Sequence, residues 1–385
     1  MEQALEFALW FSVAAVVLIT AGYPVFLAMM GAIRAKPRRT SDDEPKVTMI
    51  IAAHNEETCI AAKLDNSLAL DYPTDHLEII VASDGSSDRT NEIVESYRSR
   101  GVTLQAVRRM GKTGAQNQAV RGARGEIVVF SDANAFYRPD AIRKLVRNFA
   151  DPEVACVSGQ LVYRTDAEGA GDCERSYWDY EKFMKRRESE LSSLIGANGS
   201  IYAVRREDYV ELDHALISDL CEPLALVMRG RRVVYEPDAV SIEEASTSYG
   251  GEFRRKVRIL TRSINGVLHM RALFNPFRYG IFSFQLLMHK LMRYLVPLFL
   301  FGAAASLTAL AYLGSYRGLF AVASITALLA LWVGRGGLNG RGGAVIRVLH
   351  MIYYYLLVNY ALILAWFNVL KGAQLTVWAP ERQNA

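Results

Sequence analysis

The sequence has little net charge and few cysteines, and each of these features argues against certain classes of function. Its 385 residues carry a formal charge of +4 and contain no dense run of Lys and Arg. A track of phosphate contacts needs such runs, so we expect no nucleic-acid partner. The four cysteines are scattered and form no Cys-x-x-Cys pair. This pattern disfavours a cysteine metal cluster or a disulfide framework and is typical of a reducing compartment.

Two common nucleotide-binding motifs are also missing. The polar loop after the second expected strand does not read Gly-x-Gly-x-x-Gly, which disfavours a dinucleotide fold of the usual kind. No Gly-x-x-x-x-Gly-Lys-Ser/Thr occurs, so a P-loop is excluded. No internal repeat with a period of about 20 to 50 residues is visible, so a repeat architecture is not expected.

The N-terminal part of the sequence is a long apolar run. It reaches from about Leu5 to Ile33 and exceeds the roughly 20 residues that cross a bilayer. A cleaved signal peptide is the alternative, but it would have a shorter apolar core and a basic start, whereas this start is acidic. Basic residues follow the run, at Arg34, Lys36, Arg38 and Arg39. By the positive-inside rule, we expect residues 1–34 to be a transmembrane anchor that places the next domain in the cytoplasm.

Residues 45–270 have the pattern of a soluble α/β domain. Strand-like runs are Val47–Ala52, Leu77–Ala82, Val102–Val107 and Ile127–Ser131, and the amphipathic stretches between them include Thr58–Leu70 and Thr90–Ser99. Strands that alternate with helices predict a largely parallel, doubly wound sheet.

The C-terminal part is apolar again. Residues 275–292 mix aromatic and basic side chains and predict a helix in the membrane interface, with a short core helix as the alternative. Residues 293–371 contain three apolar segments that we expect to be transmembrane helices, followed by a tail at 372–385. Arg335, Arg341 and Arg347 lie between the last two segments and place that loop on the cytoplasmic side. We therefore expect a multi-pass protein of the cell (inner) membrane with a cytoplasmic soluble domain.

Polar residues follow the first two predicted strands at the point where each strand ends. His54, Asn55 and Glu56 come after the first strand, and Asp84 ends the second. In an open α/β sheet, ligands bind just beyond the carboxyl ends of the strands. The alternative for each position is an ordinary polar turn that caps a helix. A carboxylate such as Asp84 could accept hydrogen bonds from a ribose or a base.

The fourth predicted strand ends in Asp132-Ala133-Asn134. Side chains at positions i and i+2 of an extended chain point the same way, so Asp132 and Asn134 can present two oxygens to one point. Hard divalent cations prefer oxygen ligands and also coordinate diphosphate. The sequence therefore suggests a Mg²⁺ or Mn²⁺ site, although a polar strand terminus is the alternative.

The order of these motifs resembles that of membrane-bound family 2 glycosyltransferases, the relatives of hyaluronan, cellulose and poly-N-acetylglucosamine synthases. The motifs are His-Asn-Glu-Glu, Asp-Gly-Ser-Ser-Asp, Gly-Lys-Thr-Gly-Ala-Gln-Asn and Asp-Ala-Asn, and the resemblance covers nearly the whole chain. It implies a GT-A-like doubly wound mixed sheet with transmembrane helices at both ends. It further implies that Asp84 contacts the uridine part of the donor and that Lys112 lies near the donor. Asp132 and Asn134 take the place of the family's Asp-x-Asp metal motif, with one negative charge fewer.

Downstream motifs extend the resemblance. Gly196, Asn198 and Gly199 lie in what looks like the acceptor-side loop of the family. Asp219 falls in the place of the catalytic base, although Ser218 replaces the acid that usually precedes it. An inverting transfer needs one carboxylate to accept the proton of the acceptor hydroxyl. A helix cap is the alternative role of Asp219.

The last motif is incomplete. Arg258 alone matches the family's Gln-x-x-Arg-Trp, in which the arginine can stabilise a departing diphosphate. A basic helix on anionic lipid is the alternative. The missing Gln and Trp argue against processive polymerisation.

The sequence thus predicts an inverting, metal-dependent glycosyltransferase of cell-surface polysaccharide synthesis. It would move a sugar from a nucleotide-sugar donor, expected to be a UDP-sugar, to a lipid-linked or glycan acceptor, with membrane lipid around its helices. Two alternatives stay open: a processive polysaccharide synthase, and a nucleotide-binding membrane scaffold without catalysis.

Overall fold

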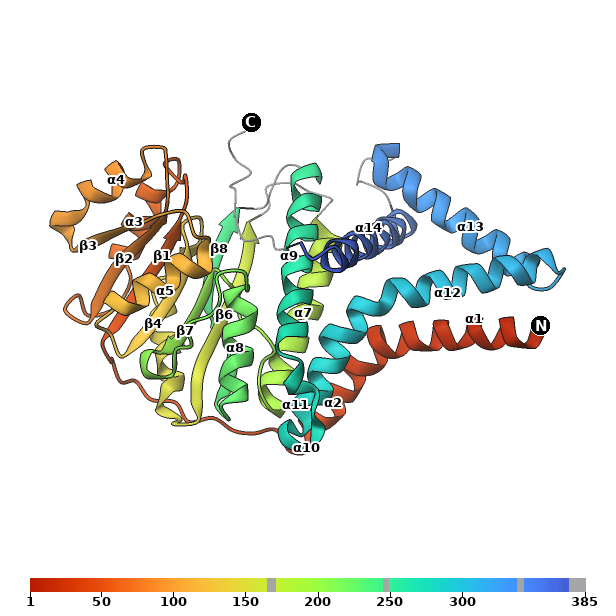
Figure 1. The fold of residues 1–385 in the computed structure, drawn as a ribbon, viewed down its shortest axis with the longest axis horizontal. Coiled ribbons are helices and arrows are strands. Elements are labelled where there is room, and N and C mark those ends of the chain that lie inside the picture. Colours follow the sequence, from red (N-terminus) through yellow and green to blue (C-terminus); the bar gives the residue numbers. More distant parts are fainter. Residues whose placement is uncertain (165–170, 245–248, 338–342, 374–385) are drawn as a thin grey trace.

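A computed structural model gives the fold of the chain. It describes residues 1–164, 171–244, 249–337 and 343–373. A sheet flanked by helices lies at one end of the molecule, and long apolar helices extend from the other end (Figure 1). The helices α7 (Gly171–Leu191) and α9 (Tyr249–His269) stand between these two parts.

The sheet has eight strands in the order β3-β2-β1-β4-β7-β6-β8-β5. Their bounds are β1 Val47–Ala53, β2 Leu77–Asp84, β3 Val102–Val107, β4 Ile127–Asp132, β5 Phe136–Tyr137, β6 Val154–Arg164, β7 Ile201–Arg205 and β8 Arg232–Glu244. Strands β3, β2, β1 and β4 are parallel, whereas β7 runs antiparallel to both β4 and β6. Strand β8 is parallel to β6 and antiparallel to β5.

Helices cover both faces of the parallel half, which is why its inner strands β1 and β4 are largely apolar. All seven residues of β1 are buried. Met49 and Ile51 pack in one hydrophobic cluster with α3 (Ile60–Leu68), and Ile50 packs on the opposite face in a second cluster with α5 (Lys112–Gly122). The first cluster also contains side chains of α4 (Thr90–Ser96) and α6 (Ala141–Val146), and the second contains those of α8 (Ser218–Met228) and α9.

The predicted doubly wound architecture is confirmed, with a mixed sheet. The four strands expected from the sequence are β1 to β4, each within two residues of its expected end. The other four strands form the mixed half. Because β5 pairs with β8 at Phe136 and Ile242, the segment after β4 is held against the C-terminal end of β8.

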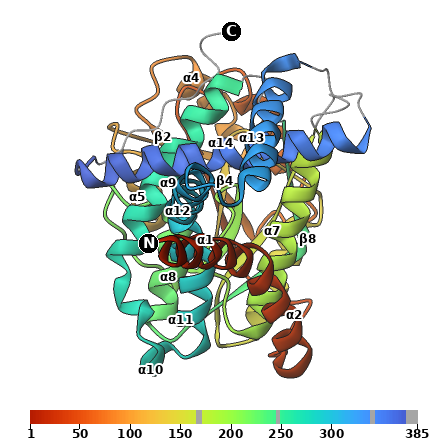
Figure 2. The same ribbon diagram turned by 90° about the vertical axis from the view of Figure 1, so that its right-hand side faces the viewer.

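Four helices among the described residues are long and apolar enough to cross a membrane: Glu2–Arg34, Ile281–Tyr312, Arg317–Gly336 and Ala344–Leu370. The first consists of α1 (Glu2–Val17), a π-helical turn and α2 (Tyr23–Arg34). The second combines α11 (Ile281–Leu286), another π-helical turn and α12 (Arg293–Tyr312). The last two are built on α13 (Arg317–Trp332) and α14 (Ala344–Leu370). Helices α1 and α12 lie side by side in both views (Figures 1 and 2).

The segment 275–292, which we expected to lie in the membrane interface, is divided in the structure. Its first residues form the short helix α10 (Pro276–Tyr279), where Phe277 is fully exposed. Gly280 then adopts a positive φ of 55°, and the chain continues from Ile281 directly into the second long apolar helix.

A buried polar contact joins the soluble part to the apolar helices. Glu188 of α7 is fully buried, and its carboxylate accepts a hydrogen bond of 2.8 Å from the Tyr23 hydroxyl of α2. The Nδ1 atom of His289, at the start of the second apolar helix, lies 2.6 Å from the same carboxylate oxygen. Helix α9 packs against α14 on the other side, where Phe253 and Tyr360 stack. These contacts fix the sheet relative to the long helices.

Candidate functional site

The end of β2 is tied to the start of α5 by Asp84. Its buried carboxylate accepts hydrogen bonds from the backbone N–H groups of Met110, at 2.7 Å, and Gly111, at 3.0 Å. Gly111 has a φ of 86°, which glycine adopts without strain, and it immediately precedes α5. Asp84 therefore shapes the loop that delivers Lys112, the first residue of α5, to the carboxyl edge of the sheet.

His54 lies beside Asp84 at the end of β1. The ring is buried, and its Nδ1 atom is 2.7 Å from the backbone carbonyl oxygen of Asp84. The Arg109 guanidinium contacts the same ring, with Nη1 2.7 Å from Nδ1. Sequence reasoning missed Arg109, although its position just before the Gly-Lys-Thr-Gly loop was a usable signal.

Asn55 and Glu56 form the turn after β1. Asn55 has a φ of 55°, and its side-chain oxygen accepts a hydrogen bond of 2.8 Å from the Ser87 N–H. The Glu56 side chain is buried, and its backbone N–H donates to the Thr90 hydroxyl at 2.8 Å. Both residues thus join the segments after β1 and β2, which places these two polar segments side by side.

Lys112 and Asp132 form the centre of the site. Their side chains make an ion pair at the end of β4, and both are about three-quarters buried. The Lys112 ammonium also donates to the backbone oxygen of Gly199 at 3.2 Å. Burial alone would lower the pKa of Lys112, but the negative charges of Asp132 and Asp219 outweigh it and raise that pKa. Its neighbours therefore favour the charged form of Lys112.

Two further polar side chains flank Asp132. Asn134 is half-buried and its side chain makes no hydrogen bond to the described part of the chain. Glu243 is 5% exposed on β8, one residue beyond the pairing of Phe136 with Ile242. Burial and the charge of Asp132 raise the pKa of Glu243 to about 7. No group of three or more His, Cys, Asp or Glu side chains suited to hold a metal ion occurs among the described residues.

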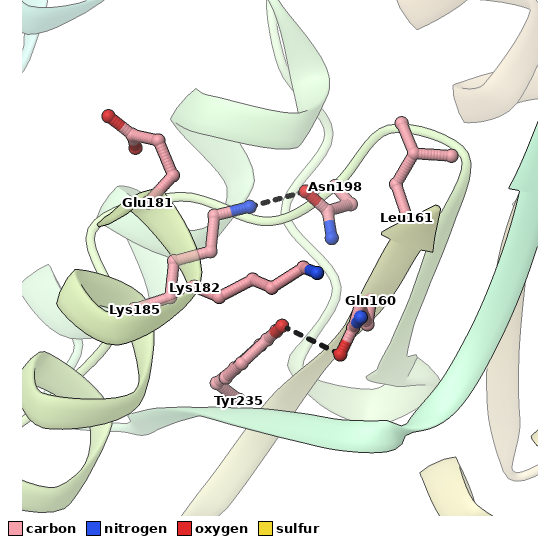
Figure 3. A pocket seen from close by; sticks show the side chains of 7 residues that line it. All are labelled: Gln160, Leu161, Glu181, Lys182, Lys185, Asn198 and Tyr235. Carbon is pink, nitrogen blue, oxygen red and sulfur yellow. Dashed lines mark hydrogen bonds between the residues drawn. The ribbon is translucent and has the colours of Figure 1, made fainter. Parts of the chain in front are cut away.

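The loop before β7 brings Gly196, Asn198 and Gly199 to the same edge. The side-chain amide of Asn198 donates to the Gly159 carbonyl, and its oxygen accepts from Lys185 of α7 (Figure 3). A Cβ atom added to Gly199 would lie 2.5 Å from Asp219 Oδ2 and 3.2 Å from Lys112 Nζ. Because Gly199 has no side chain, the Asp219 carboxylate and the Lys112 ammonium group can both lie next to it.

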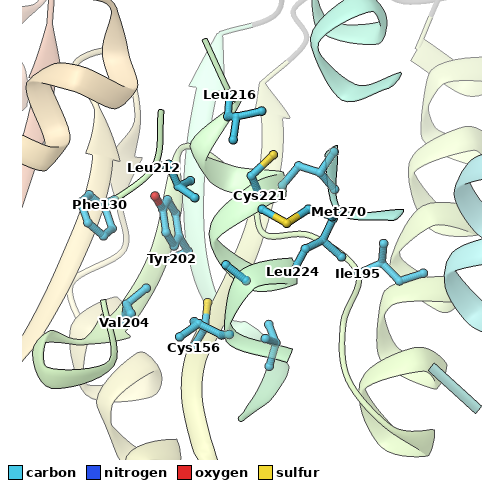
Figure 4. Close-up of a cluster of buried hydrophobic side chains, with 14 of the residues drawn as sticks. Phe130, Cys156, Ile195, Tyr202, Val204, Leu212, Leu216, Cys221, Leu224 and Met270 are labelled. Atoms are coloured by element: carbon cyan, nitrogen blue, oxygen red, sulfur yellow. The ribbon is translucent and has the colours of Figure 1, made fainter. Parts of the chain in front are cut away.

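Asp219 lies in the first turn of α8. The helix begins at Ser218 with Ile217 as its N-cap, and no side chain caps it, so the capping role considered for Asp219 is not observed. The helix is anchored by Cys221 and Leu224, which are buried in the hydrophobic cluster below the site (Figure 4). The Asp219 backbone oxygen accepts from the Ala197 N–H at 2.7 Å, which joins α8 to the Gly199 loop.

The Asp219 carboxylate is open to a ligand. It accepts no hydrogen bond from the residues that the structure describes. Burial raises its pKa, and the charge of Asp132 raises it further, while Lys112 and Arg262 oppose the shift. A carboxylate in this environment binds a proton more readily than an exposed aspartate does, as a general base requires.

Helix α9 carries Arg258, which the sequence analysis selected, and Arg262, which it did not select. Arg258 is half-buried on α9 and has an interaction partner in the folded chain. Arg262 donates to the Leu216 backbone oxygen at 2.9 Å, in the loop before α8, and its charge acts on Asp219. Residues four apart share one helical face, so the spacing from Arg258 was the signal that could have found Arg262.

The site therefore consists of two linked parts. His54, Asn55 and Asp84 join the polar loops at one end, and Lys112, Asp132, Gly199 and Asp219 converge at the other. Gly111 and Lys112, consecutive in sequence, connect them. Alternating carboxylates and cations at the carboxyl edge of a sheet suit a ligand that carries negative charge together with a metal ion.

Comparisons with known proteins identify a family for the middle part of the chain. Residues 48–212 match the family described as "Glycosyl transferase family 2". The poly-beta-1,6-N-acetyl-D-glucosamine synthase of Staphylococcus aureus is 27% identical over 261 residues, which are 61% of this chain and 62% of that protein. The beta-monoglucosyldiacylglycerol synthase of a Synechocystis species is 37% identical over 178 residues, which are 43% of this chain and 36% of that protein. The chain therefore spans less than two thirds of the length of these relatives.

A solved structure matches over almost the whole chain. The mannosyltransferase PcManGT from Pyrobaculum calidifontis, in complex with GDP-Man and Mn²⁺, has a TM-score of 0.70 and 25% identity. The match covers 96% of this chain and 99% of that one. This likeness confirms the predicted fold class, a GT-A-like mixed sheet with long apolar helices at both ends.

Proposed function

Residues 48–212 of this chain are a family 2 glycosyltransferase domain, and from that premise we propose a sugar transfer at a membrane. The protein moves a sugar from a nucleotide-sugar donor to an acceptor hydroxyl, with inversion at the anomeric carbon and with a divalent metal ion. Its acceptor is lipid-linked or a glycan of the cell surface.

The observation that carries the proposal is the convergence of Lys112, Asp132 and Asp219. These residues come from α5, β4 and α8, yet they border on one space at the carboxyl edge of the sheet. A transfer from a nucleotide sugar needs a positively charged environment for the leaving diphosphate and a carboxylate for the attacking hydroxyl. Lys112 supplies a positive charge for the diphosphate, and Asp219 supplies the carboxylate for the hydroxyl.

The residues present fit a divalent metal ion. Asp132 offers a carboxylate oxygen, and Asn134 offers an amide oxygen that the described residues leave without a partner. Mg²⁺ is commonly held by one or two protein oxygens, with waters and substrate phosphates completing its shell, so a two-residue donor set is sufficient. Asp132 and Asn134 would hold the ion, which would neutralise charge on the leaving diphosphate. The Mn²⁺ in the PcManGT complex supports this assignment.

The donor's other contacts follow from the two linked parts of the site. Lys112 is placed to attract the diphosphate, because its ammonium group lies beside Asp132, the carboxylate that would hold the metal ion. Asp84 and the adjoining His54 and Asn55 line the end that would receive the nucleoside. The Asp84 carboxylate accepts hydrogen bonds from two backbone N–H groups, so other lone pairs of its oxygens remain available to a ribose or a base. Arg258 would reach the donor from α9.

Asp219 acts as the general base in this proposal. The acceptor hydroxyl gives its proton to the Asp219 carboxylate while its oxygen forms a bond to the anomeric carbon. The bond from that carbon to the diphosphate breaks, and the electron pair leaves with the nucleoside diphosphate. The raised pKa of Asp219 and its open lone pairs support this role.

Two versions of the reaction are considered, which differ in whether one sugar or many sugars are added to the acceptor. The likeness to a poly-N-acetylglucosamine synthase favours repeated addition to a glycan. The likeness to a glucosyldiacylglycerol synthase favours a single addition to a lipid, as does the incomplete motif around Arg258. We propose single addition. The four long apolar helices support membrane association, and the basic loops favour a site on the cytoplasmic face.

The test is a nucleoside-diphosphate release assay on the full chain in detergent. UDP-sugars and GDP-sugars are screened with Mn²⁺ or Mg²⁺, and the active donor is then used with the variant Asp219→Asn. Loss of a general base reduces the rate by about 10²–10⁴-fold. We expect this loss in transfer, with donor binding retained.

Asp213→Asn is the matched control, because Asp213 is an exposed aspartate in the loop before α8. It should retain the activity of the unmodified chain. If no nucleotide sugar is consumed, or if Asp219→Asn transfers sugar at the full rate, the catalytic proposal is wrong. Donor binding without turnover in the unmodified chain would instead support a scaffold.

A further inference from the structure

Of the two proposed metal ligands, Asp132 lies within the sheet and Asn134 lies beyond it. Asp132 is the last residue of β4, where it pairs with Ala52 of β1. Asn134 follows in a turn, which the Ala135 N–H closes with a hydrogen bond of 3.2 Å to the Asp132 backbone oxygen. The position of Asn134 relative to Asp132 therefore depends on what holds the chain directly after this turn.

The chain after the turn is β5, which lies at the end of the sheet and pairs with β8. An edge strand leaves backbone N–H and C=O groups unpaired on its outer side. In Tyr137 of β5, both groups are bound by the side chain of Asn66 on α3. The Asn66 side-chain oxygen accepts from the Tyr137 N–H at 2.8 Å, and its nitrogen donates to the Tyr137 carbonyl oxygen at 3.0 Å. Asn66 thus takes the place of a further strand.

Lys63, one turn before Asn66 on α3, contacts the same segment. Its side chain is fully buried, and its ammonium group donates to the Ala135 backbone oxygen. The ammonium group also lies 4.2 Å from the centre of the Tyr137 ring, and no carboxylate of the described residues forms an ion pair with it. Burying an ammonium group without an ionic partner is unfavourable, and groups kept in such environments are often functional. One face of α3 therefore holds the chain at both Ala135 and Tyr137, directly after Asn134.

The Tyr137 side chain is anchored independently of Asn66. Its hydroxyl group lies 3.0 Å from the backbone oxygens of Phe130, in β4, and of Ser200, which follows Gly199. The ring is buried. These anchors remain when the Asn66 side chain is removed, so we expect the turn that carries Asn134 to shift while β5 stays in the sheet.

We propose that Asn66 is a positioning residue that holds Asn134 at the distance from Asp132 at which both side chains bind one divalent metal ion. Residues that orient metal ligands without touching the metal commonly change the metal affinity about 10–100-fold when they are replaced. Asn66 carries no charge, so its replacement leaves the net charge of the site unchanged and reports on position. The inference rests on the metal assignment of the proposed function, but metal binding can be measured without any sugar transfer.

The experiment is a titration of the full chain in detergent with Mn²⁺, in which electron paramagnetic resonance measures the free ion. The unmodified chain is compared with Asn66→Ala, with Asn134→Ala and with the variant that carries both changes. We expect Asn66→Ala to lower the Mn²⁺ affinity about tenfold or more. In a chain that already carries Asn134→Ala, the same change should alter the affinity by less than about twofold, because the ligand through which Asn66 acts is absent.

Asn148→Ala is the matched control, since Asn148 also uses its side-chain amide to hold the backbone. It donates to the Lys144 backbone oxygen at 2.8 Å and to Glu236 at 3.0 Å, and none of its hydrogen bonds involves residues 132–137. This variant should lower the unfolding midpoint, as Asn66→Ala does, and keep the Mn²⁺ affinity within about twofold of the unmodified chain. Each titration is carried out below the unfolding midpoint of the variant, so that lost folding is not mistaken for lost affinity.

The outcomes separate the positioning role from the proposed function. If Asp132→Ala abolishes Mn²⁺ binding but Asn66→Ala leaves the affinity unchanged, or lowers it equally with and without Asn134, the positioning role is refuted and the metal assignment stands. An unmodified chain that binds no Mn²⁺ would contradict the metal assignment and the positioning role together. The expected coupling in a chain that consumes no nucleotide sugar would contradict the proposed transfer and support the positioning role.

Discussion

Replacing Gly199 by alanine adds one methyl group, which should lower the rate of catalysis and leave the stability of the fold almost unchanged. In Gly199→Ala the new Cβ would lie 2.5 Å from Asp219 Oδ2, whereas ordinary contacts of a Cβ begin at 3.4 Å. The carboxylate must therefore move by about 0.9 Å, the difference between these two distances. A displacement of about 1 Å in a reacting group can cost about 100-fold in rate. We expect that loss in the turnover number.

The stability of this variant should change little. The Cβ would press on the ends of the Asp219 and Lys112 side chains rather than on the backbone or the hydrophobic clusters. The assay is release of nucleoside diphosphate, measured together with donor affinity and the thermal unfolding midpoint. Donor affinity should fall less than turnover, because Asp219 acts on the acceptor.

Gly122→Ala is the matched control. Gly122 ends α5, the helix that begins with Lys112, and its Cβ would meet nothing closer than Gln105 at 3.9 Å. Alanine also favours the helix by about 1 kcal/mol relative to glycine. Gly122→Ala should therefore keep full activity. If Gly199→Ala also turns over at the rate of the unmodified chain, Asp219 is not positioned through Gly199 and the reasoning fails.

Three further predictions concern metal dependence, pH and the junction with the apolar helices. Asp132→Ala should abolish metal-stimulated activity; full activity in that variant, or in the unmodified chain with a chelator, would refute the metal assignment. Burial raises the pKa of Glu222 from 4.5 to about 8, so its contribution to stability is fully present below about pH 4.5 and is lost as the pH rises through about 8. Glu222→Gln should flatten the dependence of the unfolding midpoint on pH in that interval, and an unchanged dependence would contradict the assignment. Tyr23→Phe removes a donor to the buried Glu188 carboxylate and should cost about 1.5–3 kcal/mol of stability, while Tyr312→Phe at an exposed tyrosine should cost nothing measurable.

The parallel half of the sheet could be predicted because its signals are local. Each of the first four strands is an apolar run, and β1, β2 and β4 end abruptly in polar residues. Strands that run in parallel place their carboxyl ends on one edge, so the convergence of Asp84 and Asp132 near that edge followed from the pattern. The two loops are joined through the consecutive residues Gly111 and Lys112, which the pattern did not reveal.

The family resemblance predicted that the sheet is mixed, but local patterns did not predict the strands of the mixed half, because these strands depend on contacts between distant segments. Glu243 reads as an exposed charge in Ile242-Glu243-Glu244, yet the pairing of β8 with β5 and β6 buries it. Arg262 was overlooked because its role depends on the loop before α8, which only the folded chain brings to α9.

In the membrane part, too, local patterns could be predicted from the sequence, whereas contacts between distant segments could not. Hydropathy alone located the four long apolar helices. It did not reveal that residues from Ile281 onward continue into the second of them, since that boundary is set by the positive φ of Gly280. The polar contact of Glu188 with Tyr23 and His289 likewise requires three segments to meet.

An experimental structure of the full chain with Mn²⁺ and the nucleoside diphosphate of the active donor tests the central claim most directly. The account predicts the metal ion on Asp132 and Asn134, the diphosphate beside Lys112, and an open space between the diphosphate and Asp219. A nucleotide bound elsewhere on the chain, or an Asp219 carboxylate shielded from the diphosphate by protein, would contradict it.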